Sequence, residues 1–212
     1  IFGVREHSMG AILNGLALSG FRVFGSTFLA FADYLKPAIR MSALMNLPVT
    51  YIFTHDSIMV GQDGPTHQPV EQLAMLRSIP NMRTFRPADG KEIVGCWNEI
   101  MNHKGTAAII LSRTDVEVLE HTDPSLVQKG AYIVKKENNL LHGIIIATGT
   151  EVGTAINIAT ELFQEHGLQI RVVSMPSQEL FLKQDPKYQE EILPKTYRKI
   201  VIEAGSSYGW HR

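Results

Sequence analysis

The sequence contains a single cysteine, Cys96, which can form neither an internal disulfide bond nor a cysteine-based zinc site. Such sparse cysteine usage is typical of a reducing compartment, so we expect a cytoplasmic protein. Neither sign of charge is in excess: 20 basic and 21 acidic residues give a formal charge of −1, which excludes a bulk attraction to nucleic acid or anionic membranes. Long apolar runs are also missing, and none approaches the roughly 20 residues that span a bilayer.

The sequence does not begin with methionine, and because Arg5 and Glu6 come almost at once we do not expect its first residues to be a basic-then-apolar leader. We therefore expect the chain to begin partway through a longer protein. Disorder is excluded by a hydrophobic fraction of 44%, and 212 residues fit two compact α/β domains.

Helix-like and strand-like apolar patterns alternate along the chain, which is typical of parallel sheets covered by helices. The spacing predicts helices over 5–19, 29–46, 70–79, 89–103, 151–166 and 186–193, the fourth of them opened by a capping box of Asp89 and Glu92. Strands are predicted over 21–25, 49–53, 83–86, 106–111, 131–135, 143–147, 170–174 and 199–203. The predicted fold class is α/β, with two consecutive parallel-sheet units.

The segment between these units is acidic, contains Asp123-Pro124 and shows no periodicity. We interpret 114–129 as a linker between a first domain at 1–113 and a second at 130–212. The second domain is expected to be incomplete, because the sequence stops soon after a strand, where a crossover helix would follow.

Polar residues gather after the predicted strand 49–53, where His55, Asp56, Asp63 and His67 fall within one loop. Ligands of open parallel sheets bind outside the carboxyl ends of the strands, so this loop is a candidate polar-ligand site. A turn whose side chains satisfy local backbone groups is an alternative. A metal site is a third, although the spacing matches no recognised ligand motif.

Other candidates have simple structural alternatives. Glu6 opens an apolar helix, where a carboxylate also complements the helix dipole. Phe28, Phe31 and Tyr34 recur every third residue and are predicted to share one helical face, which is more typical of core than of a cofactor platform. Arg113 follows the strand 106–111 and can bind a phosphate or pair with a surface carboxylate.

A series of motifs occurs in fixed order along the chain: Gly-Val-Arg-Glu-His at 3–7, Ser-Thr-Phe-Leu-Ala-Phe at 26–31, Thr-His-Asp-Ser at 54–57, Asp-Gly-Pro-Thr-His-Gln-Pro-Val-Glu at 63–71, Leu-Ser-Arg at 111–113, Ala-Thr-Gly-Thr-Glu-Val at 147–152 and Val-Val-Ser-Met-Pro at 172–176. Together they resemble the transketolase family of thiamine-diphosphate enzymes, over essentially the whole chain. The resemblance implies the pyrimidine-binding domain followed by most of the C-terminal domain.

The resemblance also implies a cofactor site. Glu6 matches a glutamate that hydrogen-bonds N1′ of the cofactor's aminopyrimidine and so promotes its activation. Phe31 matches the aromatic on which the pyrimidine stacks, and Phe28 and Tyr34 match the rest of that pocket. The resemblance therefore implies that at least Phe31 belongs to a binding site and not to the core.

Four residues match substrate contacts of the family. His55 and Arg113 match residues that hold the sugar phosphate, and Asp63 matches a contact to a substrate hydroxyl. His67 matches an imidazole close to the reacting carbons, so it is a catalytic candidate together with Glu6. Near these residues the sequence departs from the family pattern at Gln62, where an acidic residue is common, and at Thr114-Asp115, where an amide pair is common.

A larger departure concerns the diphosphate half of the site. The family holds the diphosphate and Mg²⁺ through a Gly-Asp-Gly motif and a downstream asparagine of an N-terminal domain, and no Gly-Asp-Gly occurs here. The resemblance therefore implies that the Mg²⁺ ligands lie outside this chain, in a separate N-terminal segment or a partner subunit of a homodimer.

The implied activity is transfer of a two-carbon ketol unit from a ketose phosphate to an aldose phosphate, as part of a transketolase. The isolated chain is expected to be inactive. One alternative is a split-chain or related enzyme of the 1-deoxyxylulose-5-phosphate synthase type. Another is a non-catalytic dimerisation fragment.

Overall fold

The computed structural model describes residues 2–211, so Ile1 and Arg212, at the outer ends of the two predicted domains, lie outside the described residues. The chain forms two compact units, each built around a four-stranded sheet. The first unit consists of residues 2–85, 98–115 and 204–211, and the second of 86–97 and 116–203. The placement of the domain boundary at 113–130 stays a prediction.

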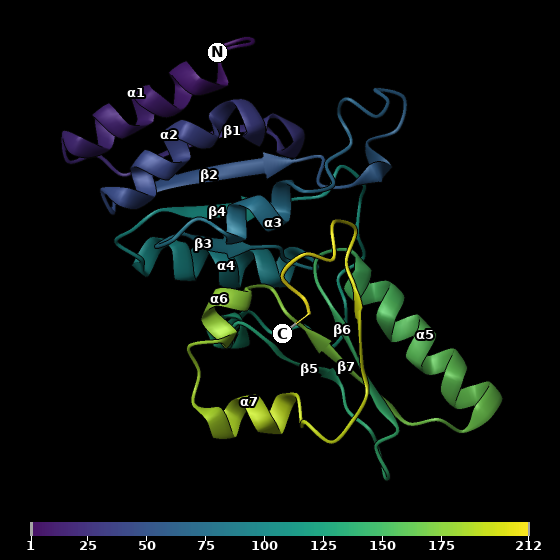
Figure 1. Cartoon of the computed structure of the whole chain (residues 1–212). Helices are drawn as coiled ribbons and strands as arrows, with labels where there is room; N and C mark the ends of the chain where they lie inside the picture. Colours follow the sequence, from purple (N-terminus) through teal and green to yellow (C-terminus); the bar gives the residue numbers. More distant parts are fainter. Residues whose placement is uncertain (1, 212) are drawn as a thin grey trace. The chain divides into compact units, whose positions relative to one another are not determined.

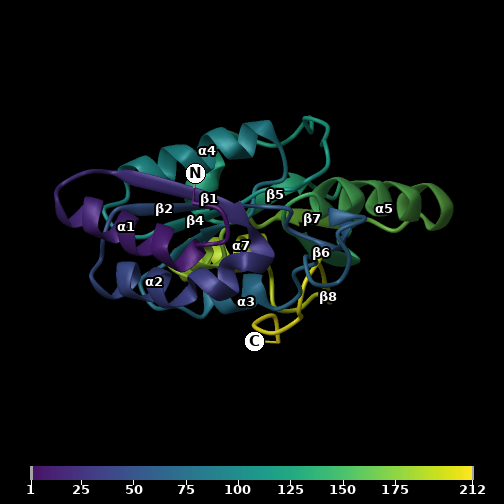
Figure 2. The same cartoon turned by 90° about the horizontal axis from the view of Figure 1, so that it is seen from above.

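The sheet of the first unit is parallel throughout, with strand order β1-β2-β4-β3. Its strands are β1 (Val23–Phe28), β2 (Val49–Thr54), β3 (Arg83–Phe85) and β4 (Ala107–Ile110). Figure 2 shows α1, α2 and α3 on one side of this sheet. These helices are α1 (Glu6–Leu18), α2 (Ala32–Leu44) and α3 (Gln72–Arg77). Between them and the sheet lies the core, centred on Leu35, Ile39, Tyr51 and Phe53, all fully buried.

The second sheet has strand order β5-β7-β6-β8 and is parallel except for its edge strand β5. Its strands are β5 (Tyr132–Lys135), β6 (Gly143–Ala147), β7 (Ile170–Ser174) and β8 (Lys199–Ile202). The helices of this unit are α5 (Glu151–His166), α6 (Gln178–Phe181) and α7 (Pro186–Ile192), and Figure 1 shows α5 alongside β6 and β7. The α/β class with two mostly parallel sheets is thus confirmed, whereas the antiparallel β5 and the short α6 were not predicted.

A buried carboxyl group fixes the start of α4 (Gly90–Asn102) to the second unit. Glu92 is fully buried and accepts hydrogen bonds from the Tyr132 and Ser174 hydroxyls and from the Ala88 N–H. Burial raises the pKa of the Glu92 carboxyl. Asp89 accepts the Glu92 N–H at 3.0 Å, as in a capping box, but Glu92 reaches back to Ala88 and not to Asp89.

Short 3₁₀ segments complete the chain: η1 (Leu29–Phe31), η2 (Ile58–Val60) and η3 (Pro124–Lys129). Residues 114–123, the greater part of the predicted linker at 114–129, contain neither helix nor strand. No described helix is long and apolar enough to cross a membrane.

Candidate functional site

The candidate residues of the first unit emerge from the carboxyl ends of its parallel strands. Phe28 is the last residue of β1 and pairs with Thr54, the last residue of β2. On the other side of β2, Phe53 pairs with Ile110, the last residue of β4. The residues that follow β2 and β4 therefore leave the sheet at the same edge as Phe28, and Figure 1 shows β2 ending in the long loop that leads to α3.

Aromatic and imidazole rings gather at this edge. The His55 ring stacks on Phe28, with 3.6 Å between centroids and 22° between planes. Phe28 and Phe31 lie nearly parallel with centroids 6.0 Å apart, and Phe31 in turn is 6.1 Å from Tyr34. The His67 ring meets Phe31 edge-on at 5.2 Å. Five of the predicted site residues are thus part of one contiguous ring cluster.

The structure corrects the interpretation of the aromatic repeat as one face of a helix. Phe28 ends a strand, Phe31 lies in η1 and only Tyr34 lies in a regular α-helix, α2. None of the three belongs to the core: Phe28 and Phe31 are half-buried, and the Tyr34 side chain is 64% exposed. Accessible ring faces of this kind can bind a flat heterocycle by stacking.

His55 adopts an unusual backbone conformation, with φ at 59° in the left-handed region. This region costs a residue with a Cβ of order 1 kcal/mol or more and is concentrated at functional sites. The Nδ1 of His55 lies 2.9 Å from the Thr54 hydroxyl oxygen, which orients the ring over Phe28. The turn after β2 therefore holds the imidazole in a fixed position at the sheet edge.

The loop that carries Asp63 and His67 turns through two glycines with positive φ, Gly61 at 88° and Gly64 at 79°. Glycine adopts such angles without a steric cost, so both positions favour it. Asp63 lies exposed between them, and its carboxylate makes no hydrogen bond or ion pair within the described part of the chain. His67 is half-buried, and its Nδ1 lies 2.9 Å from the Thr66 hydroxyl.

Glu6 is placed at a second feature of this unit, a cavity of about 530 Å³ between the start of α1 and β1. It is the first residue of α1 and is half-buried. The cavity is lined by Phe2, Gly3, Glu6, Met9, Phe24, Gly25, Ser26 and Thr27. Since Thr27 directly precedes Phe28, the cavity extends along β1 toward the ring cluster.

Arg113 follows β4 and is exposed at the same sheet edge. The Leu111 N–H donates to the Phe53 carbonyl at 2.7 Å, so the chain stays paired with β2 for one residue beyond β4. The Arg113 guanidinium has no hydrogen bond or ion pair within residues 2–211. The alternative in which it pairs with a surface carboxylate therefore finds no support, and the guanidinium stays available to an anion.

Two contacts of the site were not foreseen from the residues. The His55–Phe28 stack joins two segments far apart in the sequence and follows from the β1–β2 register. The cavity wall at Ser26 and Thr27 depends on β1 reaching Phe28, whereas the pattern predicted a strand ending at Gly25.

In the described part of the chain no group of three His, Cys, Asp or Glu side chains is arranged to hold a metal ion.

Comparison with known proteins identifies related domains in both parts of the chain. The family model described as the pyrimidine-binding domain of transketolase matches residues 1–118, and that of the transketolase-like C-terminal domain matches residues 130–212. A probable transketolase from Streptococcus pneumoniae is 51% identical over 214 residues, which cover 100% of this chain and 32% of that protein.

Solved structures give the same result. The transketolase from Leishmania mexicana superimposes with a TM-score of 0.94 at 43% identity, covering 98% of this chain and 31% of that one. A split-gene transketolase, described as an inactive β4 tetramer, superimposes with a TM-score of 0.81 at 27% identity, covering 96% and 64%. This chain spans about a third of the length of the S. pneumoniae and L. mexicana proteins. With both of its parts matched in this way, the chain belongs to the transketolase family.

Proposed function

We propose that this chain forms the pyrimidine side of a thiamine-diphosphate site and, within a complete enzyme, carries out transketolase chemistry on sugar phosphates. The observation that carries the proposal is the ring cluster of Phe28, Phe31, Tyr34, His55 and His67 at one sheet edge. It combines stacking surfaces for a heterocycle with imidazoles for a polar substrate, in a chain of transketolase ancestry.

The described residues fit one half of the cofactor. Phe31 is half-buried outside the core and offers a ring on which a pyrimidine can stack, and Glu6 lines the neighbouring cavity along β1. The diphosphate and its Mg²⁺ find no comparable acidic cluster in the part of the chain that the structure describes. We assign that half to a separate N-terminal segment or to a partner subunit.

The proposed mechanism divides the work among this chain's residues. The Glu6 carboxyl group would hydrogen-bond N1′ of the aminopyrimidine and would hold or release the proton there. When bound, thiamine diphosphate supplies the carbanion chemistry that cleaves and forms the carbon–carbon bond. His67 would lie close to the reacting carbons, and Asp63 would accept a hydrogen bond from a substrate hydroxyl. His55 and Arg113 bind the substrate phosphate, because a guanidinium and an imidazole at one edge can face the same anion.

The alternative functions differ in which polypeptide, if any, supplies the diphosphate half of the cofactor site. A split-chain enzyme, in which the N-terminal segment is a separate polypeptide, agrees with the likeness to the split-gene transketolase. That relative is described as an inactive tetramer, which also favours the second alternative, a fragment that assembles without turnover. An enzyme of the 1-deoxyxylulose-5-phosphate synthase type is a third alternative, with His55, His67 and Arg113 again serving a sugar phosphate.

We expect the isolated chain to bind thiamine diphosphate more weakly than micromolar and to show no transketolase activity. The physical reason is the diphosphate, whose charge would have neither Mg²⁺ ligands nor helix N-termini of the other half to compensate it. Calorimetric titration with cofactor and Mg²⁺ measures the affinity, and micromolar or tighter binding would contradict the assignment of that half to another segment.

Addition of the missing segment tests the proposed function itself. The N-terminal part of the S. pneumoniae relative, produced separately, should restore ketol transfer when mixed with this chain, cofactor and Mg²⁺. A chain carrying Glu6→Gln is the matched control, because it should join the same complex with little turnover. A stable complex that binds cofactor but converts no ketose phosphate would leave the dimerisation fragment as the better interpretation.

The homodimer also stays a proposal, and exposed apolar side chains of the first unit support it. Ile12 and Leu16 on α1 are 48% and 42% exposed, and Phe24 on the edge strand β1 is 67% exposed. Together with Leu18 and Phe21 they form an apolar surface of the kind that marks protein interfaces.

We expect the chain to sediment as a dimer at micromolar concentration and the double variant Ile12→Glu, Leu16→Glu to sediment as a monomer. Two buried carboxylates per subunit would disfavour association strongly. Val94→Glu, at a 62% exposed position of α4, is the control and should leave the dimer intact. A wild-type chain that stays monomeric would count against an interface carried by this segment.

A further inference from the structure

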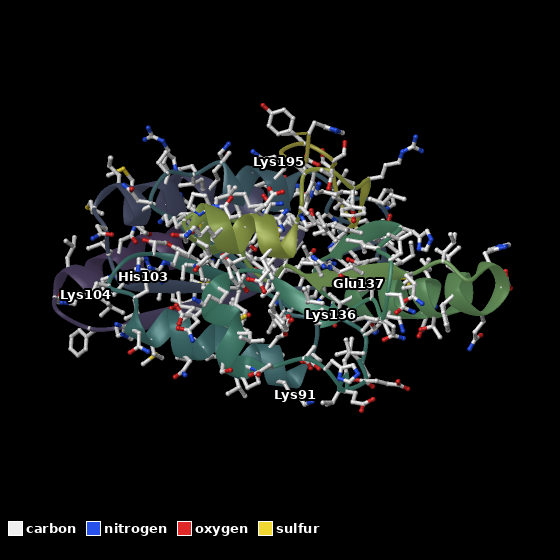
Figure 3. All side chains as sticks on the ribbon, turned by 90° about the horizontal axis from the view of Figure 1, so that it is seen from below. Lys91, His103, Lys104, Lys136, Glu137 and Lys195 are labelled. Atoms are coloured by element: carbon white, nitrogen blue, oxygen red, sulfur yellow. The ribbon has the colours of Figure 1, made fainter. Side chains whose placement is uncertain are left out.

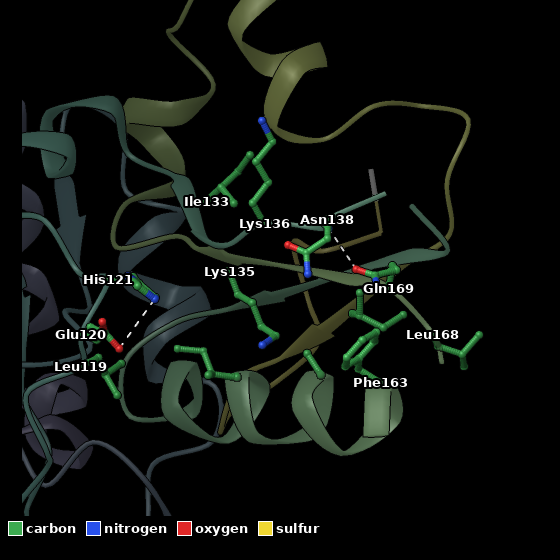
Figure 4. A pocket seen from close by; sticks show the side chains of 13 residues that line it. Leu119, Glu120, His121, Ile133, Lys135, Lys136, Asn138, Phe163, Leu168 and Gln169 are labelled. Atoms are coloured by element: carbon green, nitrogen blue, oxygen red, sulfur yellow. Dashed lines mark hydrogen bonds and ion pairs between the residues drawn. The ribbon is translucent and has the colours of Figure 1, made fainter. Parts of the chain in front are cut away.

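The second unit contains a cavity of its own, which takes no part in the candidate site. It has a volume of about 640 Å³, within the range of small-molecule sites. Its walls come from residues 119–121, from β5 and the turn after it, from α5 and from the start of β7. Figure 4 shows the space between β5 and α5 from close by.

Most of the lining is hydrocarbon. Ile133, Ile156, Leu168 and Ile170 are half-buried around the cavity, and the Phe163 ring on α5 is 47% exposed. The core packs beneath these side chains, with Ala159 fully buried in the floor. An apolar ligand lying here would remove this surface from water, which favours binding.

One cation enters this apolar space. Lys135 is half-buried on β5, lines the cavity together with Ile133, and extends its side chain into the cavity toward α5 (Figure 4). Its ammonium makes no hydrogen bond or ion pair with any residue in 2–211. Asn138 points its amide into the same space, on a turn held by the bond from its backbone N–H to Gln169 Oε1 at 3.0 Å.

The neighbouring charges leave Lys135 available to an anion. The adjacent carboxylate, Glu137, forms an ion pair with Arg171, and Lys136 beside it is exposed at the rim (Figures 3 and 4). At the other end of the cavity, the Glu120 Oε2 atom lies 3.8 Å from His121 Nε2, and the Glu120 side chain is 87% exposed. Lys135 is therefore the cation that enters the cavity, while Glu137 is paired with Arg171 and Glu120 lies beside His121 at the exposed end.

We propose that this cavity binds an amphiphilic anion, with an aliphatic chain between β5 and α5 and one carboxylate or phosphate head group at Lys135 and Asn138. The apolar walls match the chain, and the half-buried ammonium matches the head group by charge. An aliphatic alcohol would lack the ionic contact, and a small inorganic anion would lack the apolar one. Both features together thus set the class of ligand.

Decanoate is the probe for this proposal, titrated into the purified 212-residue chain by calorimetry and followed by amide chemical shifts. We expect one decanoate per chain, with shifts concentrated at residues 133–138 and 156–170. Decanol should bind about 10-fold more weakly than decanoate, because the loss of one charge-assisted hydrogen bond lowers the affinity by about that factor. Acetate should not bind measurably, because it has no aliphatic chain to fill the apolar part of the cavity. Decyl phosphate in place of decanoate shows which head group the site prefers.

Two variants separate the head group from the chain. Lys135→Gln should weaken decanoate about 10-fold and leave decanol unchanged, whereas Phe163→Ala should weaken both. Lys183→Gln, an exposed lysine of the same unit outside the cavity, is the matched control and should bind like wild type. Thermal melting curves establish that each variant is folded.

The proposal is overturned if decanol binds as tightly as decanoate, if Lys135→Gln retains wild-type affinity, or if decanoate binds in many copies without saturation. Each of these results is compatible with the proposed catalytic role of the first unit. Conversely, one saturable decanoate site sensitive to Lys135 would support the proposal even if the chain proves inactive.

Discussion

Replacing Glu6 by glutamine in a complete enzyme that contains this chain should lower kcat by about 10²–10⁴-fold, the usual contribution of one acid–base group. An amide occupies the same space as the carboxyl group, and Glu6 is only half-buried at the first position of α1, so the fold should be retained. The loss is therefore expected in turnover, measured at saturating cofactor.

A matched substitution far from the site controls for the loss of one negative charge. Glu161→Gln, on the exposed side of α5, makes the same chemical change and should leave kcat unaltered. Turnover within threefold of wild type at saturating cofactor would remove Glu6 from its proposed role.

Arg113→Ala should raise KM for a ketose phosphate, by about 10–150-fold for each 1.4–3 kcal/mol of phosphate binding that is lost, and leave kcat nearly unchanged. A guanidinium can make two parallel charge-assisted hydrogen bonds to phosphate, each contributing roughly 1.5–3 kcal/mol. Every 1.4 kcal/mol lost corresponds to about a tenfold change in affinity. The exposed guanidinium has no partner among the described residues, so its removal leaves no buried charge behind.

A second ketol donor, one that carries no phosphate group, provides the internal control for the Arg113→Ala variant. Hydroxypyruvate carries no phosphate for Arg113 to bind, so its kinetic constants should change little. Steady-state kinetics with both donors distinguish the two roles. Equal losses with both donors would mean that Arg113 is structural.

Regular elements with clear end signals were predictable from the sequence. The helix predicted over 151–166 is observed as α5 with the same bounds, because Gly167 ends it in the left-handed conformation. The strand predicted over 143–147 is likewise observed as β6, a run of buried apolar residues. The direction of β5 was not predictable, since its antiparallel pairing with β7 depends on contacts distant in the sequence.

The candidate site was predictable in its residues but not in its geometry. The carboxyl-edge rule places His55 and Arg113 at one sheet edge, and β2 and β4 do pair in that register. The aromatic repeat, by contrast, suggested a helix, because a spacing of three residues does not reveal that β1 runs on to Phe28. The stack of His55 on Phe28 depends on strand pairing, which a local pattern does not contain.

The first unit is completed by a segment from the far end of the chain. Residues 204–211 return to it: the Ser206 N–H donates to the Val70 carbonyl at 2.8 Å, and the Arg77 guanidinium lies 5.5 Å from the Trp210 ring centroid. Val70 comes directly after the loop that carries Asp63 and His67. During synthesis on the ribosome, the sheet and helices of this unit can assemble early, since domains fold as their residues emerge. The contacts that residues 204–211 make with Val70 and Arg77 can form only after the intervening second unit has been translated, so we expect the loop that carries Asp63 and His67 to be stabilised later than the sheet.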